Sequence, residues 1–337
     1  AVMSPVDGLI TRTTPITVSG TATDPHLAGV TVNGAAANLG GGSFSLEVDL
    51  QEGANPLTVV AADFLGHTSE VSVTVVLDTT PPVLTVFESG TEFVGELLLG
   101  RPVVITVVAD DATEVELVAT IDGQPYMLGT PYDDGGSHIF EANAEDAAGN
   151  TTTASRSFSI DNDPPLVDEI SPPSGSVHDG IAIDITGRVS DDAAEVTVGG
   201  VTATLGAAAG GWIGWTASGV ALEQEGFNLL PLRAADSAGN ATDLELTFDR
   251  DTGAPQITLT APAEGLVTRF SALTVEGVAS DSHLDSVTVN GAAVTAGADG
   301  SFSHPVTLVE GANTITVTAT DVVFHETTVV RTPTCLL

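Results

Sequence analysis

Apolar and polar positions alternate along the first 77 residues in short runs that turn-forming residues separate. The runs are rich in Val and Thr and lie at 15–22, 29–34, 43–50, 56–63 and 68–77, with Gly, Asn, Asp or Pro between them. A period of two is typical of strands that bury one face. The tripeptides VNG (32–34) and AGN (148–150) predict tight hairpin turns, because Gly and Asn accept positive φ. The pattern therefore predicts an all-β protein.

The same pattern returns along the chain, and two of its copies are close. The first and fourth copies share VTVNGAA (30–36 and 287–293) and EGAN (52–55 and 310–313). A third copy extends from SPPSG (171–175) to AADSAGN (234–240), and a second, divergent copy keeps VVADD (107–111) and AEDAAGN (144–150). Repetition of this length indicates consecutive modules of one fold.

A fixed spacing of aspartates marks the repeat boundaries. An Asp that opens a hairpin is followed 15 residues later by an Asp in a Pro-containing linker, in the pairs Asp63–Asp78, Asp146–Asp161 and Asp236–Asp251. We expect domains at 1–79, 80–163, 164–252 and 253–337, the second divergent and the fourth with a last strand that Pro333 interrupts. About seven short strands per domain predict four tandem immunoglobulin-like antiparallel β-sandwich domains in an elongated rod. We call these four ranges segments 1 to 4.

The charge balance excludes several classes of chemistry and of binding partner. The 337 residues contain 45 Asp and Glu against eight Arg and no Lys, a formal net charge of −37. Without lysine there is no P-loop, no Schiff-base chemistry and no Lys–Asn isopeptide bond, and such an acidic surface argues against nucleic acid or an anionic membrane as a partner. Hydrophobic residues still make up 42% of the chain, so the charge belongs to folded domains.

The ends and the single cysteine indicate where the protein works. Cys335 has no second cysteine with which to form an intrachain disulfide, and no apolar run approaches the length of a membrane span, so we expect no membrane insertion. The chain opens on strand-like sequence without a signal segment. We expect a mature or excised piece of an exported protein, secreted or on the cell surface of a bacterium.

Large aromatic residues are few, and we expect most of them in the cores. Phe44 and Phe302 occupy equivalent positions, and Phe64 follows the hairpin Asp of segment 1. Trp212 and Trp215 stand three residues apart, which in a strand places them on opposite faces. One is expected in the core and the other at a domain junction; the alternative is that they contact a ligand such as a sugar.

The repeated residues carry a resemblance. SPVDGLITRTTPITVSGTATD (4–24), VTVNGAA, GSFSLEVDLQEGANPLTVVAAD (42–63) and their copy at 261–321 resemble glucodextranase domain B-like modules. These are immunoglobulin-like modules of bacterial surface proteins and of polysaccharide-active enzymes. The DxAGN hairpins and Asp-Pro linkers of segments 2 and 3 are similar to the tandem repeats of giant bacterial adhesins, and that similarity implies calcium at the domain junctions.

The acids have a geometric rationale in this fold. A chain that enters a sandwich at the end carrying its B–C and F–G loops, and leaves at the other end, brings each linker acid to the loops of the next domain. Carboxylates that converge repel one another unless a cation binds, and Ca²⁺ takes six to eight oxygen ligands. With no lysine in the chain, we expect bound metal or open water to balance these acids. The predicted clusters are Asp78 with Asp110 or Asp111, Asp146 and Asn150; Asp161 and Asp163 with Asp191, Asp192, Asp236 and Asn240; and Asp249 and Asp251 with Asp281 and Asp321.

The alternative for each single acid is a turn-forming role through hydrogen bonds to the backbone. Segment 4 has no linker acid of its own, whereas segment 1 keeps Asp24 and Asp63, which suggests a preceding domain or a partner there. His26 and His283 are repeat equivalents, as are His67 and His325, so we expect structural roles for them. His138, His178 and His304 have no nucleophile or metal-ligand spacing beside them in the sequence.

We therefore expect a non-enzymatic extracellular protein, a calcium-stiffened immunoglobulin-like rod that serves as an adhesin stalk or as the subunit of a surface layer or filament. Its partners would be neighbouring domains, copies of itself joined through open sheet edges, or a cell-surface glycan or protein. The alternative is a carbohydrate-binding accessory region of a secreted polysaccharide-degrading enzyme, in which Trp212 or Trp215 contacts the sugar.

Overall fold

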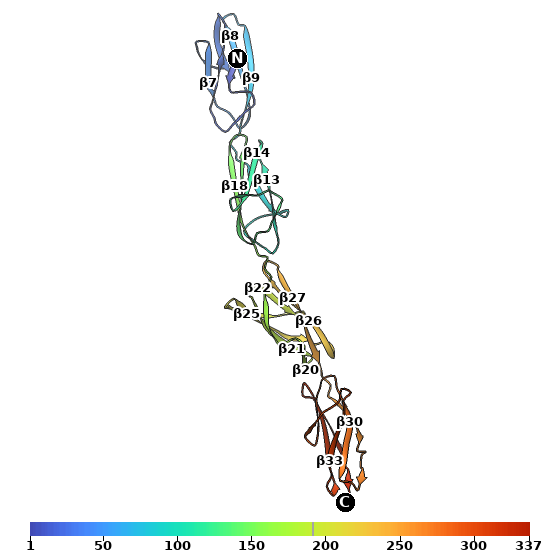
Figure 1. Cartoon of the computed structure of the whole chain (residues 1–337). Helices are drawn as coiled ribbons and strands as arrows, with labels where there is room; N and C mark the ends of the chain where they lie inside the picture. Colours follow the sequence, from blue (N-terminus) through green and yellow to red (C-terminus); the bar gives the residue numbers. More distant parts are fainter. Residues whose placement is uncertain (191) are drawn as a thin grey trace. The chain divides into compact units, whose positions relative to one another are not determined.

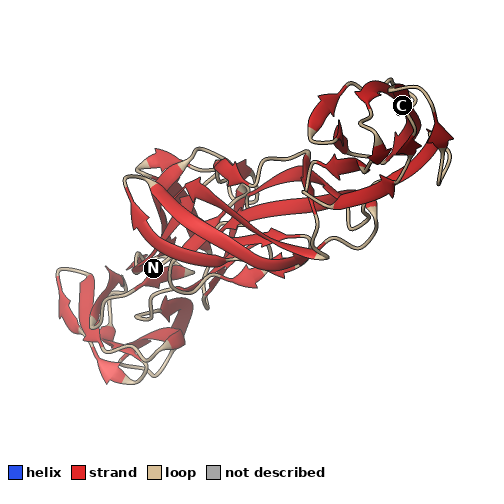
Figure 2. Cartoon of the chain, turned by 90° about the horizontal axis from the view of Figure 1, so that it is seen from below, coloured by secondary structure: helices blue, strands red, loops and turns tan. Residues whose placement is uncertain are grey.

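The computed structural model describes residues 1–190 and 192–337 of the chain (Figure 1). Every regular element in these residues is a strand, as Figure 2 shows by colour. The described residues therefore contain no helix long and apolar enough to cross a membrane. The chain divides into two compact units, Ala1–Asn162 and Asp163–Leu337.

Four sheets form the first unit. Segment 1 contributes the sheets β1-β3-β7-β6 and β2-β9-β8-β4-β5, and segment 2 contributes β11-β10-β13-β16 and β12-β18-β17-β14-β15. The strands of segment 1 are β1 (Val2–Ser4), β2 (Leu9–Thr11), β3 (Ile16–Thr21), β4 (Leu27–Val32), β5 (Ala35–Ala36), β6 (Asn38–Gly40), β7 (Ser43–Val48), β8 (Gly53–Asp63) and β9 (Thr68–Leu77). Those of segment 2 are β10 (Val83–Glu88), β11 (Thr91–Glu92), β12 (Leu97–Leu99), β13 (Val103–Asp110), β14 (Val115–Ile121), β15 (Gln124–Pro125), β16 (Pro131–Tyr132), β17 (Gly136–Asp146) and β18 (Thr151–Ile160).

In the second unit, segment 3 repeats the arrangement of two sheets, whereas the described strands of segment 4 form three. The sheets are β19-β21-β25-β24 and β20-β27-β26-β22-β23 in segment 3, and β28-β30-β33, β32-β31-β35-β36 and β29-β37-β34 in segment 4. The strands of segment 3 are β19 (Val167–Ser171), β20 (Ser176–His178), β21 (Ala182–Ser190), β22 (Ala193–Val198), β23 (Val201–Thr202), β24 (Thr204–Ala209), β25 (Trp212–Ala221), β26 (Gly226–Asp236) and β27 (Ala241–Arg250). Those of segment 4 are β28 (Gln256–Ala261), β29 (Val267–Thr268), β30 (Ala272–Ser280), β31 (Leu284–Val289), β32 (Ala292–Val294), β33 (Ser301–Thr307), β34 (Gly311–Ala312), β35 (Ile315–Asp321), β36 (Glu326–Arg331) and β37 (Thr334–Cys335).

The chain is all-β and built of tandem immunoglobulin-like β-sandwiches, as the alternating pattern predicts. The predicted run 68–77 coincides with β9, and Asn33 and Gly34 adopt positive φ (48° and 83°) in the expected hairpin turn. One feature differs from an antiparallel sandwich. A short early strand in each segment pairs in parallel with the last strand, in the pairs β2–β9, β12–β18, β20–β27 and β29–β37. These strands have two or three residues, too few to show a period in the sequence.

Four clusters of buried hydrophobic side chains fill the sandwiches, one within each segment. Val, Ile, Leu and Ala dominate them, and Phe44 and Phe302 are buried as expected, at 3% and 5% exposure. The expectation for Phe64 is wrong, because its side chain is 78% exposed. Phe64 directly follows the last residue of β8, at the tip of the β8–β9 hairpin, where no facing sheet covers it.

A glycine faces a large aromatic side chain across two paired strands in three of the segments. The pairs are Gly20 with Phe44, Gly187 with Trp215, and Gly277 with Phe302. A Cβ at these glycines would lie 2.8, 2.5 and 2.8 Å from the ring of the partner. Each ring therefore lies against a position at which a Cβ would clash, and this lets sheets of small residues pack with few aromatic side chains.

Pro333 interrupts the last strand, as the sequence predicts. β36 ends at Arg331, and the chain resumes as β37, which pairs with β29 and β34. Cys335 in β37 is fully buried in the core of segment 4.

Candidate metal sites at the hairpin ends

The first strand of each long hairpin ends in an aspartate, and the carboxylate of that aspartate accepts hydrogen bonds from the backbone of the turn. Asp63, Asp146, Asp236 and Asp321 close β8, β17, β26 and β35, and each accepts a hydrogen bond from the backbone N–H four residues later. The turn role that was the alternative for a single acid is therefore present in all four segments.

The linker acids are fixed by a second repeated contact. The backbone N–H of Asp78, Asp161 and Asp251 donates to the carbonyl of the residue that ends the short parallel strand, at 2.8 to 2.9 Å. The acceptors are Thr11, Leu99 and His178. This contact extends the parallel pairing by one residue and holds each linker acid at the exit of its segment.

At the first junction the linker acid meets the loops of segment 2. Oδ2 of Asp78 accepts a 2.9 Å hydrogen bond from the Thr113 hydroxyl, and the same hydroxyl lies 3.0 Å from Oδ1 of Asp111. A hydroxyl has one proton and serves only one acceptor at a time. Two carboxylates therefore compete for one donor between them.

The hairpin of segment 2 supplies the third carboxylate. Nδ2 of Asn150 donates 2.8 Å to Oδ2 of Asp146 and 2.9 Å to the Asp78 carbonyl. Carboxylate oxygens of Asp78, Asp111 and Asp146 all lie within 4.8 Å of one another. Asp78 and Asp146 are buried, at 2% and 5% exposure. The structure thus brings together the first predicted cluster, with Asp111 rather than Asp110, whose side chain lies exposed at the end of β13.

The charge state of Asp78 follows from these contacts. Burial alone would raise the pKa of the Asp78 carboxyl, but hydrogen bonds from Thr113 and Thr80 outweigh it and lower the pKa below its ordinary value. The carboxylate is therefore ionised at neutral pH. Arg12 donates to the carbonyl of Gly149 in the hairpin, but among the described residues no ion pair joins it to these acids. The cluster consists of oxygen donors, which are the ligands that Ca²⁺ prefers.

The members of the second predicted cluster belong to both units. Asp161 lies in the first unit and Asp163, Asp192, Asp236 and Asn240 in the second. Asp236 accepts hydrogen bonds from the backbone N–H and the side chain of Asn240, at 2.9 and 2.8 Å. Asp191 lies outside the described residues. This cluster stays a prediction.

The third junction lies within the second unit and contains two histidines. Nδ1 of His283 is 2.9 Å from Oδ2 of Asp251, and Nε2 is 3.3 Å from Oδ2 of Asp249. Nδ1 of His325 is 3.0 Å from Oδ2 of Asp321. Imidazoles contact the acids directly here, so these acids have a neighbour besides the expected metal or open water.

Burial alone would lower the pKa of His283, but its hydrogen bonds to Asp251 and Asp249 outweigh burial and raise the pKa above its ordinary value of 6.5. The sequence reasoning assigned His283 and His325 only a structural role. The signal that identifies them is the spacing: His stands two residues after Asp281 and four after Asp321, where segment 2 has Thr113 and Asn150.

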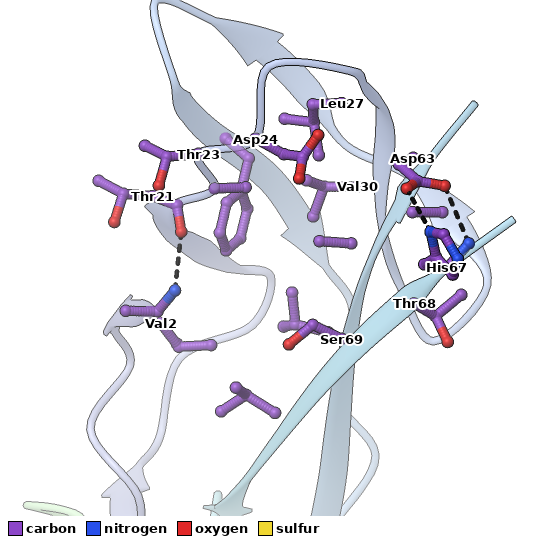
Figure 3. Close-up of a pocket in the computed structure, with 17 residues that line it drawn as sticks. Val2, Thr21, Thr23, Asp24, Leu27, Val30, Asp63, His67, Thr68 and Ser69 are labelled. Atoms are coloured by element: carbon purple, nitrogen blue, oxygen red, sulfur yellow. Dashed lines mark hydrogen bonds and ion pairs between the residues drawn. The ribbon is translucent and has the colours of Figure 1, made fainter. Parts of the chain in front are cut away.

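Segment 1 has an Asp–His pair like that of segment 4, together with a further aspartate, beside a cavity of about 450 Å³. Figure 3 shows Asp63 and His67 joined on one side of this cavity and Asp24 on another. Nδ1 of His67 lies 2.8 Å from Oδ2 of Asp63, as His325 lies next to Asp321. Among the described residues, no group of three metal-type donors includes these acids.

The two tryptophans differ as their spacing predicts. Trp215 is 2% exposed in the core of segment 3, so it is not placed to contact a ligand. Trp212 is half-buried, and the Arg188 guanidinium lies 4.6 Å from the centroid of its ring. Arg188 in turn pairs with Asp168 and Glu169. One face of Trp212 is therefore occupied by the protein itself.

One histidine has a hydroxyl that the sequence reasoning missed. Nε2 of His178 lies 2.8 Å from the Ser176 hydroxyl, two residues earlier on β20. The same hydroxyl donates to the Pro173 carbonyl at 2.8 Å. Burial lowers the pKa of His178. Because the Ser176 proton is engaged with Pro173, the arrangement is that of a structural contact, in which the serine accepts from the imidazole.

Known proteins resemble the chain at low identity. A tetra-tandem repeat from the extending region of a large adhesion protein has a TM-score of 0.38, is 23% identical, and is matched over 94% of each chain. A Ca²⁺-stabilised adhesin of an Antarctic bacterium that binds ice has a TM-score of 0.31, is 21% identical, and is matched over 95% of this chain and 93% of its own.

Among curated proteins, bacillopeptidase F of Bacillus subtilis (strain 168) is 35% identical over 111 residues. That match covers 33% of this chain and spans 8% of the length of bacillopeptidase F. The family model described as glucodextranase, domain B, matches residues 1–79 and 255–335. Segments 1 and 4, the two close copies, therefore carry the glucodextranase domain B match that their shared motifs predict.

Proposed function

We propose that this chain is a non-enzymatic structural or adhesive protein of the bacterial exterior, in which immunoglobulin-like modules act as a spacer. The repeat supports this role, because all four segments have the same hairpin acid and the first three hold a linker acid at their exit through the same backbone contact. Tandem modules of this kind transmit force and set distance, and stiff junctions improve both.

The observation that carries the proposal is the meeting of Asp78, Asp111 and Asp146. They come from three different stretches of the chain, their oxygens lie within 4.8 Å, and two of them are buried. Three carboxylates at this spacing repel one another, and the single Thr113 hydroxyl proton can serve only one of the two acids that it contacts. A bound Ca²⁺ would remove the repulsion and fix the linker to the loops of segment 2.

The residues fit this ion in kind. Asp78, Asp111 and Asp146 would hold it through carboxylate oxygens, and Asn150 would keep the linker in place through its contacts with Asp78 and Asp146. The ion supplies charge neutralisation and a clamp, with no catalytic step. We extend the proposal to the second predicted cluster, whose acids have the same spacing in the sequence.

Small-angle scattering of the whole chain tests the spacer role. In calcium the maximum dimension should be long and well defined, and in chelator the distribution of distances should broaden. Asp111→Asn should lose the part of the calcium response that comes from the first junction, whereas the neighbouring exposed Asp110→Asn should respond to calcium as the wild type does. A wild-type profile that is identical in calcium and in chelator would contradict the calcium-stiffened spacer.

The second candidate is a carbohydrate-binding accessory region, and the half-buried Trp212 favours it. Such a site needs an open aromatic face for sugar stacking, and Arg188 covers one face of this ring. Glycan-array binding that is lost in Trp212→Ala, and kept in a variant of an exposed aromatic elsewhere such as Phe64→Ala, would support it. Absence of glycan binding by the wild type would leave the spacer role alone.

A further inference from the structure

The junction acids of this chain have two kinds of neighbours. In segment 2 the acids are followed by Thr113 and Asn150, which offer oxygen and amide groups. In segment 4 the equivalent positions hold His283 and His325, and segment 1 has His26 and His67 there. The two close copies, segments 1 and 4, therefore have histidines where the middle segments do not. Their possible metal ligands include nitrogen as well as oxygen.

In segment 4 the donors converge from three stretches of the chain. Asp251 comes from the linker after β27, Asp281 and His283 from the β30–β31 connection, and Asp321 and His325 from the β35–β36 hairpin. Two groups of three have all their donor atoms within 4.8 Å of one another: Asp251, Asp281 and His283, and Asp251, Asp321 and His325. Asp251 belongs to both groups. It would therefore give the ligand from the linker to an ion in either group.

The cluster also holds more negative charge than the protein compensates. The side chains of Asp251 and Asp321 are 4% and 0% exposed. Arg250 stands between two of the acids in the sequence, but its guanidinium turns away to Glu225 and the Leu222 carbonyl. Even if both imidazoles were protonated, four carboxylates (Asp249, Asp251, Asp281 and Asp321) would leave two negative charges at the cluster. Buried carboxylates of this kind are stable when a cation neutralises them.

The donor set selects the class of cation. Ca²⁺ and Mg²⁺ take oxygen ligands, whereas imidazole nitrogen suits first-row transition metals such as Zn²⁺. Two tetrahedral ligands at about 2.1 Å from one ion are about 3.4 Å apart. Donor atoms that lie within 4.8 Å of one another therefore need to close by at most about 1.4 Å.

We propose that Asp251, Asp321 and His325, together with Asp281 and His283, form a site for a divalent transition-metal ion of the zinc class. The ion fastens the linker between segments 3 and 4 to the loops of segment 4. This site is independent of the calcium proposed at the first junction, because it uses different residues and a different class of ion. The chain would thus use oxygen-only junctions for calcium and histidine-containing junctions for transition metals.

Co²⁺ is the probe for this site, because its visible absorption reports nitrogen and oxygen ligation directly. The whole chain is stripped with chelator, dialysed and titrated with Co²⁺ and, by calorimetry, with Zn²⁺. We expect a saturable cobalt spectrum that Zn²⁺ abolishes and that excess Ca²⁺ leaves in place. Asp251→Asn and His325→Gln should each weaken binding by at least about tenfold. His67→Gln, the matched change in segment 1, should leave the spectrum and the affinity unchanged.

Circular dichroism and the unfolding midpoint establish that each variant is folded, and His283→Gln replaces His325→Gln if the latter is not. The proposal is overturned if the wild type gives no saturable cobalt spectrum. It is also overturned if the folded histidine variants bind Co²⁺ and Zn²⁺ as tightly as the wild type, or if Ca²⁺ displaces Co²⁺ at comparable concentration. Loss of the calcium response at the first junction, by contrast, leaves this result unaffected.

Discussion

Asn150 donates a 2.9 Å hydrogen bond from its side chain to the backbone carbonyl of Asp78, 72 positions earlier in the chain. The same amide donates 2.8 Å to Asp146, so one buried side chain connects a linker to the hairpin of the following segment. The connection places the Asp78 carboxylate beside Asp111. The two hydrogen bonds from Asn150 therefore join segment 1 to segment 2 and also assemble the acid cluster.

Asn150→Ala should destabilise the first unit by about 1–3 kcal/mol, because it leaves the buried Asp78 carbonyl and an Asp146 oxygen without a donor. Urea unfolding followed by circular dichroism measures the change. Asn143→Ala is the matched control: Asn143 is exposed on β17, and its loss should change the free energy of unfolding by less than about 0.5 kcal/mol. Equal effects of the two substitutions would show that the Asn150 contacts do not stabilise the junction.

Gly187→Ala should destabilise the second unit by about 1–3 kcal/mol, since the added methyl group would lie 2.5 Å from the Trp215 ring and force the core apart. Gly214→Ala is the matched control, because a Cβ there meets nothing within 4 Å. The midpoint of urea unfolding, followed by tryptophan fluorescence, reports both. If Gly187→Ala is as stable as Gly214→Ala, the ring does not require a glycine opposite it.

The pair of Glu88 and Arg101 should make the first unit acid-sensitive. Glu88 is 7% exposed, and the Arg101 guanidinium, at 2.8 Å from both its oxygens, lowers the pKa of the Glu88 carboxyl below its ordinary 4.5. A lowered folded-state pKa contributes stability above about pH 4.5 that is lost as the pH falls through the folded-state value.

The stability difference between the wild type and Glu88→Gln should therefore be largest at pH 6 to 7 and should shrink as the pH falls below about 4.5. Thermal unfolding at a series of pH values measures it. Asp243→Asn removes the exposed pair with Arg233 and should change the melting temperature little at any pH. A difference between wild type and Glu88→Gln that stays constant down to pH 3 would show that the ion pair does not titrate with folding.

The sequence allowed the fold to be predicted because its strands are long enough to show their period. The run 68–77 alternates apolar and polar residues from Val71 to Val75 and coincides with β9. The short parallel strands β2, β12, β20 and β29 were not predicted, because two or three residues contain no alternation and their pairing is set by the route of the chain between the sheets. Phe64 was misplaced because composition predicts that aromatics are buried, whereas position at a hairpin tip decides otherwise.

The candidate sites were predicted in part. The repeated spacing of 15 residues identified the linker and hairpin acids, since each spacing spans one strand and its turn. It did not distinguish Asp111 from Asp110. Adjacent residues at the end of a strand point in opposite directions, and the spacing does not show which of the two faces the linker. His283 and His325 were recognised as repeats but not as partners of the acids. Their role depends on Asp251 in the linker from the preceding segment, which lies 32 positions before His283 and 74 before His325.

The central claim is that calcium binds at the Asp78, Asp111 and Asp146 cluster and stabilises the first unit. Scanning calorimetry of the whole chain, stripped of metal and then returned to millimolar Ca²⁺, tests it most directly. If calcium is present at about 100 times its dissociation constant, it adds about 2.7 kcal/mol, which corresponds to a rise of about 5–10 °C for a unit of this size. We predict that rise for the wild type and its loss in Asp111→Asn. A wild-type melting temperature that is the same in chelator and in millimolar calcium would contradict the account.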